Sequence, residues 1–551
     1  MTSAGKQLSN QLTEDLRARF LKSGDALQLL KSRTAGVDTA VLEAQAAALT
    51  PAFPEGLALV AVGGYGRREL FPYSDVDLLI LSRRPLLDSA SRSAVSDFVR
   101  RLWDCGLRCS QSVHTIEESC ALHDGNLELT ISLLDERFLA GDVGLYGQFR
   151  ERFTRFLNSD RREILRLLCR ATRSRHAKFH QTIYRLEPDV KESPGGLRDF
   201  QATRWLQLLR AGAVEPPADP RPAALLASVR SFLHFRAARD QNFLDFESQD
   251  ELAAAPFSPW KDPAVWMRSW YRNASLIWLG VLSEMEAAET QERSMLANFR
   301  DWRARLSNSE FTVSRDLIFL RNPAELDSDA ELPLRLFQFV ARHNVAPARQ
   351  TEQRISAHVL KWTQIYAAHP PPVRWWREFL SLPSVSLALR SMRACGFLPA
   401  ILPEWERLEH LVVRDFYHHY TVDEHTIVTL ESLEDLAPVK EGPTRRFATL
   451  LEESHADLWL LRLALLLHDL GKGSGGHHEL ASHHLAQGIV ARAAIPEPDA
   501  STLLFLVQHH LALSLLLQSR DLSDPSTARQ AAALTGTEER LRLLTLMTLA
   551  D

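Results

Sequence analysis

The spacing of apolar residues predicts a small α/β unit at the start of the chain. Within 8–48, Leu12, Leu16 and Phe20 recur at helical spacing, which predicts helices. Short apolar runs at 57–63 and 76–82 predict two buried strands, and the amphipathic stretch 89–105 predicts a helix. A further apolar run at 129–135 is expected to form another strand or a buried segment.

From about residue 150 onward the pattern is helical. Prolines and paired glycines break it at 186–199, a segment too polar for a core and therefore a candidate functional loop. A length of 551 residues favours three or four domains, with one boundary expected between 320 and 330. We therefore predict an α+β protein in four parts: an α/β core with N-terminal helices at 1–150, helical regions at 151–325 and 326–410, and an all-α domain at 411–551.

Composition narrows the class of protein. Hydrophobic residues make up 45% and charged residues 24%, as in ordinary soluble proteins. The net charge of −5 argues against a large non-specific nucleic-acid surface, so nucleic acid is an unlikely partner. The five cysteines show no CxxC spacing, and the N-terminus has no apolar signal core. No apolar run reaches membrane-spanning length, so we expect a cytoplasmic protein without a membrane partner.

The first candidate site is the sequence GGYGRREL…SDVDLLIL, which starts at Gly63. Asp75 and Asp77 are two residues apart at the start of a predicted strand, so both side chains point to one face and form a carboxylate pair suited to Mg²⁺. The glycines would let a nucleotide triphosphate approach the backbone. A third carboxylate usually completes such a site. Asp135 is the best candidate, with a helix cap as its alternative role, and Glu136 is the next choice.

The second candidate site is a dispersed set of histidines and aspartates in 410–551, which holds 12 of the 20 histidines. The dipeptide His468-Asp469 follows an apolar helical run, so both side chains can reach one cation. Imidazole and carboxylate ligands suit Mn²⁺, Fe²⁺ or Zn²⁺ better than Mg²⁺. The other members of the set are His425, His478, His510 and Asp551.

The first motif resembles the nucleotidyltransferase domain of the bacterial bifunctional PII uridylyltransferase/uridylyl-removing enzymes, which belongs to the DNA polymerase β superfamily. The loop LEPDVKESPGGLRDF is also similar to a signature of that family. The resemblance implies a polymerase-β-like core in which Asp75 and Asp77 bind Mg²⁺ and catalyse transfer from UTP. Asp135 stays our candidate for the third catalytic carboxylate. By the same resemblance Gly63 and Gly64 would cradle UTP, and Ser74 is a further candidate for nucleotide binding. Lys191 and Arg198 would suit contact with the triphosphate or with the protein substrate, unless Pro and Gly give this loop a purely structural role.

The second motif set, YTVDEHT and LLLHDLGKG…GGHHELA, resembles the HD superfamily of metal-dependent phosphohydrolases and the uridylyl-removing half of the same family. The implied metal ligands are His425, His468, Asp469, His478, His510 and Asp551. His468, Asp469 and Lys472 would be catalytic, with Lys472 binding phosphate unless it is a solvated loop lysine. The neighbours His477 and His509 are alternatives to His478 and His510.

The resemblance also implies a function and a partner. The first domain would transfer UMP from UTP to a tyrosine hydroxyl of PII, a nitrogen-signalling protein. The HD domain, with Mn²⁺ or another divalent metal, would hydrolyse that phosphodiester.

The end of the chain departs from the family. Its members continue into two glutamine-sensing ACT domains, whereas this sequence ends at Asp551, an expected metal ligand. We therefore expect a natural or engineered truncation of the HD domain, loosely held Asp551, weak metal affinity and no glutamine control.

Two other functions stay open at this point. An HD-containing tRNA nucleotidyltransferase shares both superfamilies, but the acidic net charge and the 186–199 loop argue against it. A catalytically inactive scaffold that binds nucleotide and PII is the second alternative. The intact Asp75, Asp77, His468 and Asp469 argue against that reading.

Overall fold

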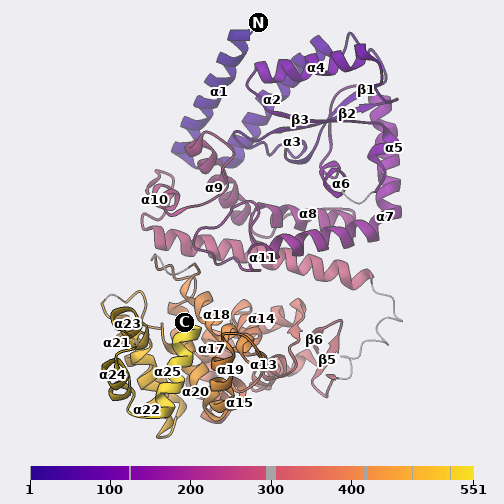
Figure 1. The fold of residues 1–551 in the computed structure, drawn as a ribbon. Coiled ribbons are helices and arrows are strands. Elements are labelled where there is room, and N and C mark those ends of the chain that lie inside the picture. The colour runs from indigo at the N-terminus through magenta and orange to yellow at the C-terminus, as the bar shows by residue number, and fades with distance from the viewer. Residues whose placement is uncertain (1, 123–125, 293–305, 415–418, 475, 522) are drawn as a thin grey trace. The chain divides into compact units, whose positions relative to one another are not determined.

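The computed structural model describes residues 2–551 except 123–125, 293–305, 415–418, 475 and 522. The chain divides into two compact units, residues 1–292 and 293–551, and each is described by itself (Figure 1). Helices predominate in both units, and the predicted α+β class is confirmed. The finer division into four parts stays a prediction.

A four-stranded mixed sheet forms the centre of the first unit, with the strand order β3-β2-β1-β4. Strand β1 is antiparallel to both β2 and β4, whereas β2 and β3 are parallel. The strands are β1 (Leu57–Ala61), β2 (Val76–Ser82), β3 (Cys109–His114) and β4 (Arg137–Gly141).

Both faces of this sheet are covered by helices, because alternate strand residues are apolar on each side. Leu78 and Ile80 point to the layer of α2 (Ala26–Ala48) and α4 (Ser89–Asp104). Leu79 and Leu81 point to the opposite layer, which contains α7 and α8. Asp77 shares the register of Leu79, so its side chain belongs to the second face. The helices of that layer and its neighbours are α7 (Val143–Ala177), α8 (Leu197–Ala211) and α11 (Pro263–Glu292).

Most predicted elements of this unit are confirmed, including the helices in 8–48, the strands at 57–63 and 76–82 and the helix at 89–105. At 129–135 the first expected form, a strand, is not found, because a helix occupies 127–133 and the next strand starts at Arg137. The second expected form, a buried segment, is met in part, since Thr130 and Leu133 of this helix are buried. The remaining helices are α1 (Thr2–Ser23), α3 (Gly63–Gly66), α5 (Ile116–Ser119), α6 (Leu127–Leu133), α9 (Arg221–Ala237) and α10 (Phe246–Ala254).

The second unit begins with a small β element and continues as helices. Strands β5 (Phe311–Ser314) and β6 (Leu317–Leu320) are antiparallel, and β6 also pairs with β7 (Ala346–Pro347). From 422 to 551 the described residues form helices, turns and loops. The helices before this point are η2 (Pro323–Asp327), α13 (Leu332–His343), α14 (Arg349–Ala368), α15 (Val373–Leu380), α16 (Val385–Ala394), α17 (Leu398–Ile401) and η3 (Pro403–Arg407).

The C-terminal helices pack around α20 (Leu458–Leu467), in which nine of the ten residues are buried. Helices α18 (Val422–Leu436) and α22 (Asp499–His509) both pack against it, and α25 (Glu538–Ala550) contacts all three. The others are α19 (Arg445–Glu453), η4 (His455–Asp457), α21 (His478–Ala493), α23 (Ala512–Ser519) and α24 (Pro525–Thr535).

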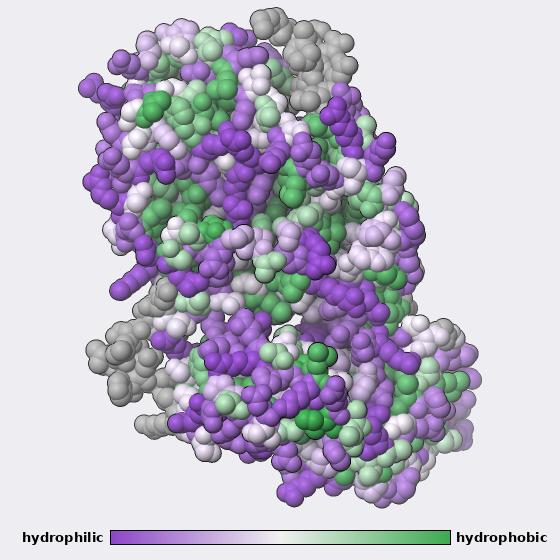
Figure 2. Space-filling view, turned by 180° about the vertical axis from the view of Figure 1, so that it is seen from behind, coloured by the Kyte–Doolittle hydropathy of each residue, from purple (hydrophilic) through white to green (hydrophobic). Residues whose placement is uncertain are grey.

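The polarity of the surface and the length of the apolar helices bear on the prediction that this protein has no membrane partner. Hydrophilic side chains cover much of the face in Figure 2, with apolar residues between them. No single helix in the described ranges has the length and apolarity needed to cross a membrane. The bent pair α22–α23 meets that test of length and composition when its two helices are taken together.

Gly66 offers a direct test of the packing behind the first strand. A Cβ at this position would lie 1.8 Å from the carbonyl oxygen of Asp135, which is backbone and cannot swing away. We expect Gly66→Ala to destabilise the first unit by on the order of 2–3 kcal/mol and to lower its thermal midpoint, measured by calorimetry.

The matched control is Gly147→Ala on α7, where the added Cβ meets nothing within 4 Å. Alanine is a better helix former than glycine, so this variant should gain roughly 0.5–1 kcal/mol. Equal thermal unfolding midpoints for Gly66→Ala and Gly147→Ala would contradict the packing described for Gly66.

Candidate active sites

The glycine turn after β1 lies directly beside the carboxylate pair. Gly63 has a φ of +55°, a conformation that glycine adopts without strain. The N–H of Val62 donates to the carbonyl of Asp77 over 3.1 Å, which fixes the turn next to β2. A Cβ at Gly63 would lie 3.5 Å from Asp77 Oδ2, so a glycine keeps this approach open.

Asp75 and Asp77 stand at the entry of β2, with Asp75 exposed and Asp77 partly buried. Burial, and then the charge of Asp75, raise the pKa of Asp77 to about 6. Arg198, Lys191 and Arg67 oppose that rise, which places three cations near the same carboxylate. The pair is therefore a negatively charged centre surrounded by positive side chains.

Two of these cations, Lys191 and Arg198, come from the 186–199 loop, and Arg230 on α9 is a third nearby cation. We call Lys191, Arg198 and Arg230 the cation group. Burial lowers the pKa of Lys191, and the charges of Arg230 and Arg198 lower it further. Arg230 also approaches the carboxylate pair, since its Nη2 lies 3.5 Å from Ser74 Oγ. Three cations beside a glycine turn suit a polyanionic ligand.

Arg230 is a member of this site that sequence reasoning missed. It lies on α9 and is 6% exposed, with its guanidinium 4.3 Å from the centre of the Phe71 ring. Its Nε donates to Asn242 Oδ1 over 2.8 Å, and Asp240 lies 3.4 Å away. In the sequence it is one arginine in an apolar helix, so only the fold could reveal its position.

The 186–199 loop is held in place by a buried aspartate. Asp199 is fully buried and accepts from the N–H of Gly195 over 2.8 Å, from Arg175, and from His176 Nε2 at 2.8 Å. Arg198 pairs instead with Glu192 at 3.4 Å and donates to Gln201. The loop therefore has a rigid base from which Arg198 and Lys191 extend.

The two candidates for a third carboxylate have other partners. Asp135 accepts from Arg67 Nη1 over 2.5 Å and from Trp205 Nε1 over 2.8 Å. Glu136 accepts from the Tyr146 hydroxyl and lies 3.2 Å from Arg150. Within the described ranges, neither forms a three-ligand cluster with Asp75 and Asp77. Asp135 instead holds Arg67, which faces the site.

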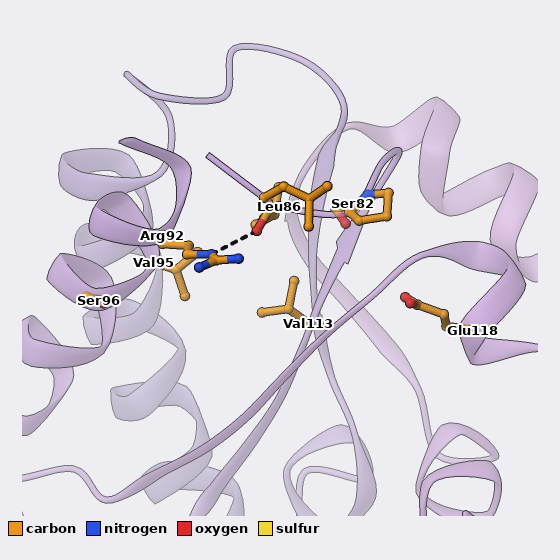
Figure 3. A pocket seen from close by; sticks show the side chains of 9 residues that line it. Ser82, Leu86, Arg92, Val95, Ser96, Val113 and Glu118 are labelled. Carbon is orange, nitrogen blue, oxygen red and sulfur yellow. Dashed lines mark hydrogen bonds between the residues drawn. The ribbon is translucent and has the colours of Figure 1, made fainter. Parts of the chain in front are cut away.

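A shallow pocket of about 350 Å³ lies at the opposite end of β2 (Figure 3). It is lined by Ser82, Val95 and Val113, and Arg92 donates to the carbonyl of Leu86 across it. Ser82 is five residues from Asp77, or roughly 17 Å along an extended strand. This pocket is therefore separate from the carboxylate pair.

In the second unit, helix ends bring the predicted His/Asp set together. His425 lies in the first turn of α18, and His468-Asp469 follows the buried helix α20. His478 begins α21, whereas His510 directly follows α22. Asp551 follows α25 and lies 2.7 Å from His425 Nε2. Six residues distant in sequence thus meet at one place, which we call the His/Asp cluster.

The ligand atoms of the His/Asp cluster fall into two groups of three. One group is His425, His468 and Asp551, and the other is Asp469, His478 and His510. Within each group the ligand atoms all lie within 4.8 Å of one another, a spacing that allows one cation per group. Asp469 also approaches the first group, with Oδ2 3.2 Å from His468 Nε2.

The ring orientation of two histidines favours metal binding. His468 Nδ1 lies 2.6 Å from the carbonyl of Leu465, and His510 Nδ1 lies 2.9 Å from that of Val507. A proton on each Nδ1 leaves Nε2 free to bind a metal. In the described parts of the chain, the buried Nε2 atoms of His468 and His478 and Oδ1 of Asp469 have no hydrogen-bond partner. The residues therefore fit a divalent cation.

The charges of the cluster are strongly coupled. Burial alone would lower the pKa of His468, but Asp469 and Asp551 raise it to about 10. Burial, followed by the charge of His468, lowers the pKa of His510 to about 4. Lys472 Nζ lies 2.7 Å from Asp469 Oδ2, so its charge is fixed at the edge of the cluster.

An ion-pair network fixes the start of α18. Glu424 is 1% exposed and accepts from Arg390 and Arg393, each over 2.6 Å. Burial raises the pKa of Glu424, but the two arginines lower it to about 2. This buried carboxylate stands next to His425, so the network positions that ligand.

The neighbouring histidines lie differently from the predicted ligands. The side chain of His477 is 84% exposed, whereas that of His478 is 26% exposed. His509 packs on Phe505 with 4.9 Å between ring centres. The structure therefore groups His478 and His510, rather than their neighbours, with Asp469.

Comparisons with known proteins identify relatives of this chain. The sequence profile of the family GlnD PII-uridylyltransferase matches residues 163–217. The bifunctional uridylyltransferase/uridylyl-removing enzymes of Ralstonia nicotianae and Thiobacillus denitrificans are 31% and 32% identical over 533 and 530 residues, covering 90% of this chain. The chain is a homologue of these bifunctional enzymes. The predicted relationship is thus confirmed.

The similarity extends over both units of the chain. The enzyme of the same description from Burkholderia pseudomallei is 30% identical over 567 aligned positions, covering 98% of this chain. The chain spans about 60% of the length of the Ralstonia and Thiobacillus relatives and 64% of the Burkholderia one.

The two ligand groups predict that the His/Asp cluster binds two divalent ions. His478→Ala removes one ligand of the second group, so we expect it to lower the bound Mn²⁺ by about one ion per chain. Metal content after equilibrium dialysis against Mn²⁺, measured by plasma mass spectrometry, reports this number even where the affinity is weak.

His477→Ala is the matched control, because its imidazole is exposed and outside both groups. It should leave the metal content unchanged. The assignment fails if the two variants lose the same amount of metal.

Proposed function

We propose that the first unit transfers UMP from UTP to a hydroxyl of the PII protein and releases pyrophosphate. We further propose that the His/Asp cluster hydrolyses the resulting phosphodiester. The observation that carries both proposals is the presence, on one chain, of a carboxylate pair beside a glycine turn and a six-residue His/Asp cluster. Homology to enzymes named for both activities supports them.

In the proposed transfer, each residue has a role that its surroundings suggest. The backbone at Gly63 and Gly64 lies next to Asp77 and leaves room for phosphate. The cation group would bind and orient the triphosphate, since its three charges converge near Ser74 and Asp77. Bound Mg²⁺ would neutralise negative charge on the phosphate oxygens while the α-phosphate is transferred and pyrophosphate leaves. Arg67, which Asp135 holds, adds positive charge behind the turn.

In the proposed removal reaction, the protein supplies a fixed set of ligands and charges. His468 and His510 have their rings oriented by backbone carbonyls, so little reorganisation is needed. Mn²⁺ or another divalent metal would lower the pKa of water and so provide a nucleophile near neutral pH. Lys472, 2.7 Å from Asp469, would offer its charge to the phosphate.

The sequence also suggests the substrates of both reactions and the compartment in which they take place. We propose PII and UTP as the substrates, and the cytoplasm as the location, where the five cysteines would stay reduced. Nitrogen regulation would be the corresponding cellular role.

Site-specific variants should separate the two activities. Asp75→Asn with Asp77→Asn removes the charge that holds Mg²⁺, so UMP addition to PII should fall at least about 1,000-fold while removal persists. His468→Ala with Asp469→Ala should abolish removal and spare addition. The mass of intact PII, followed after adding UTP or starting from PII-UMP, measures each step.

Outcomes of this assay also distinguish the alternatives. Loss of both activities in both double variants would contradict two independent sites. Incorporation of labelled nucleotide into tRNA, with PII unmodified, would favour the tRNA nucleotidyltransferase instead. Binding of UTP without any transfer would favour the inactive scaffold.

Arg230 should contribute to triphosphate binding in particular. Loss of one charge-assisted contact costs about 1.5–3 kcal/mol, so Arg230→Gln should weaken UTP binding roughly 10- to 100-fold. The affinity for UMP, which lacks the β- and γ-phosphates, should fall much less. Calorimetric titration of both nucleotides provides the comparison.

Arg236→Gln is the control on the same helix, because Arg236 pairs with Glu247 and Glu251 away from the cation group. It should bind UTP as the parent does. Equal losses for UTP and UMP in Arg230→Gln would show a general structural defect and contradict the proposed role.

A further inference from the structure

Arg108 and Asp75 are neighbours where β2 and β3 begin. In this parallel pair Val76 lies opposite Cys109, and Asp77 lies opposite Ser110. The N–H of Val76 donates to the carbonyl of Arg108 over 2.7 Å, which extends the pairing by one position. Arg108, directly before β3, and Ser110 on β3 are therefore the two positions on this side that flank the carboxylate pair.

Neither of these flanking positions carries an acid. Residue 110 is Ser, and Arg108 Nε donates to Asp75 Oδ1 over 2.8 Å. Arg108 Nη2 also lies 3.4 Å from the carbonyl of Tyr73. The strand that could complete a metal site instead places a positive charge against one of the two carboxylates.

A free divalent cation would meet an unfavourable environment here. Mg²⁺ and Mn²⁺ need several anionic or carbonyl oxygens, but one of these two carboxylates is already paired with Arg108. Lys191 and Arg198 add further positive charge near the other. A nucleoside triphosphate changes this balance, because its phosphates can bind the metal and also neutralise the arginines.

We propose that Arg108 is an internal counter-ion that keeps free divalent cation away from Asp75, so that the site accepts metal only together with a nucleoside triphosphate. Arg108 then releases Asp75 to the metal and turns its guanidinium to the phosphates. Its side chain is 65% exposed, so this movement needs no change in the core. Arg108 acts here as a positioning residue, and the identity of the nucleotide rests on the proposed function.

The test measures Mn²⁺ binding by electron paramagnetic resonance, which detects free Mn²⁺. The full chain is titrated with and without a non-transferable UTP analogue, and Asp75→Asn/Asp77→Asn shows the contribution of the His/Asp cluster alone. Without nucleotide, the parent chain should match this double variant, and the analogue should add Mn²⁺ sites. Arg108→Gln should bind Mn²⁺ at the pair without nucleotide, at least about tenfold more tightly than the parent.

Two further variants keep the test specific to this ion pair. Arg108→Lys retains the charge and should behave as the parent does. Arg101→Gln removes another exposed arginine, paired with Asp97 over 2.8 Å on α4, and should have no effect. Equal nucleotide-free affinity in the parent and in Arg108→Gln would overturn the inference, as would a parent chain that binds Mn²⁺ at the pair without nucleotide.

This readout is independent of any transfer to PII. Nucleotide-dependent Mn²⁺ binding that Arg108→Gln makes nucleotide-independent supports the inference even where PII stays unmodified, and in that case only the proposed function fails. If nucleotide-free Mn²⁺ binding is unchanged in Arg108→Gln, the inference is wrong even where PII is modified.

Discussion

An ionised side chain that leaves water needs a counter-charge, and both candidate sites depend on this constraint. His468 and Asp469 are each 1% exposed, so they stabilise one another only with a proton or a cation between them. At the other site Asp77 is balanced by Lys191 and Arg198, and Asp75 by Arg108. A substrate or metal that binds at either site must therefore replace the counter-charges that already surround these side chains.

The two sites satisfy the constraint with different chemistry, and this difference separates their roles. The first offers only carboxylates as metal ligands and surrounds them with cations, an arrangement suited to a hard metal that arrives with phosphate. The second combines histidines with two aspartates in a pre-oriented cluster, which suits a resident transition metal. The two opposite reactions that we propose for this chain require such separate sites, since a single site would favour both directions.

Sequence patterns predicted the elements whose periodicity was strong and missed those defined by the fold. Strand β2 was predictable because 76–82 is almost continuously apolar, whereas β3, CSQSVH, lies at the sheet edge and has a polar pattern. The run at 129–135 could be predicted only as a strand or a buried segment, because few of its residues decide between strand and helix. The His/Asp cluster followed from its motif, but the partners of Asp135 and the positions of Arg230 and Arg108 depend on tertiary contacts.

Anomalous X-ray scattering from crystals grown with Mn²⁺, with and without a non-transferable UTP analogue, would locate the metal at both sites. We expect Mn²⁺ peaks at both ligand groups of the His/Asp cluster in every crystal. We expect a peak between Asp75 and Asp77 only where the analogue is bound. A peak at this pair in nucleotide-free crystals, or none at the His/Asp cluster, would contradict the account.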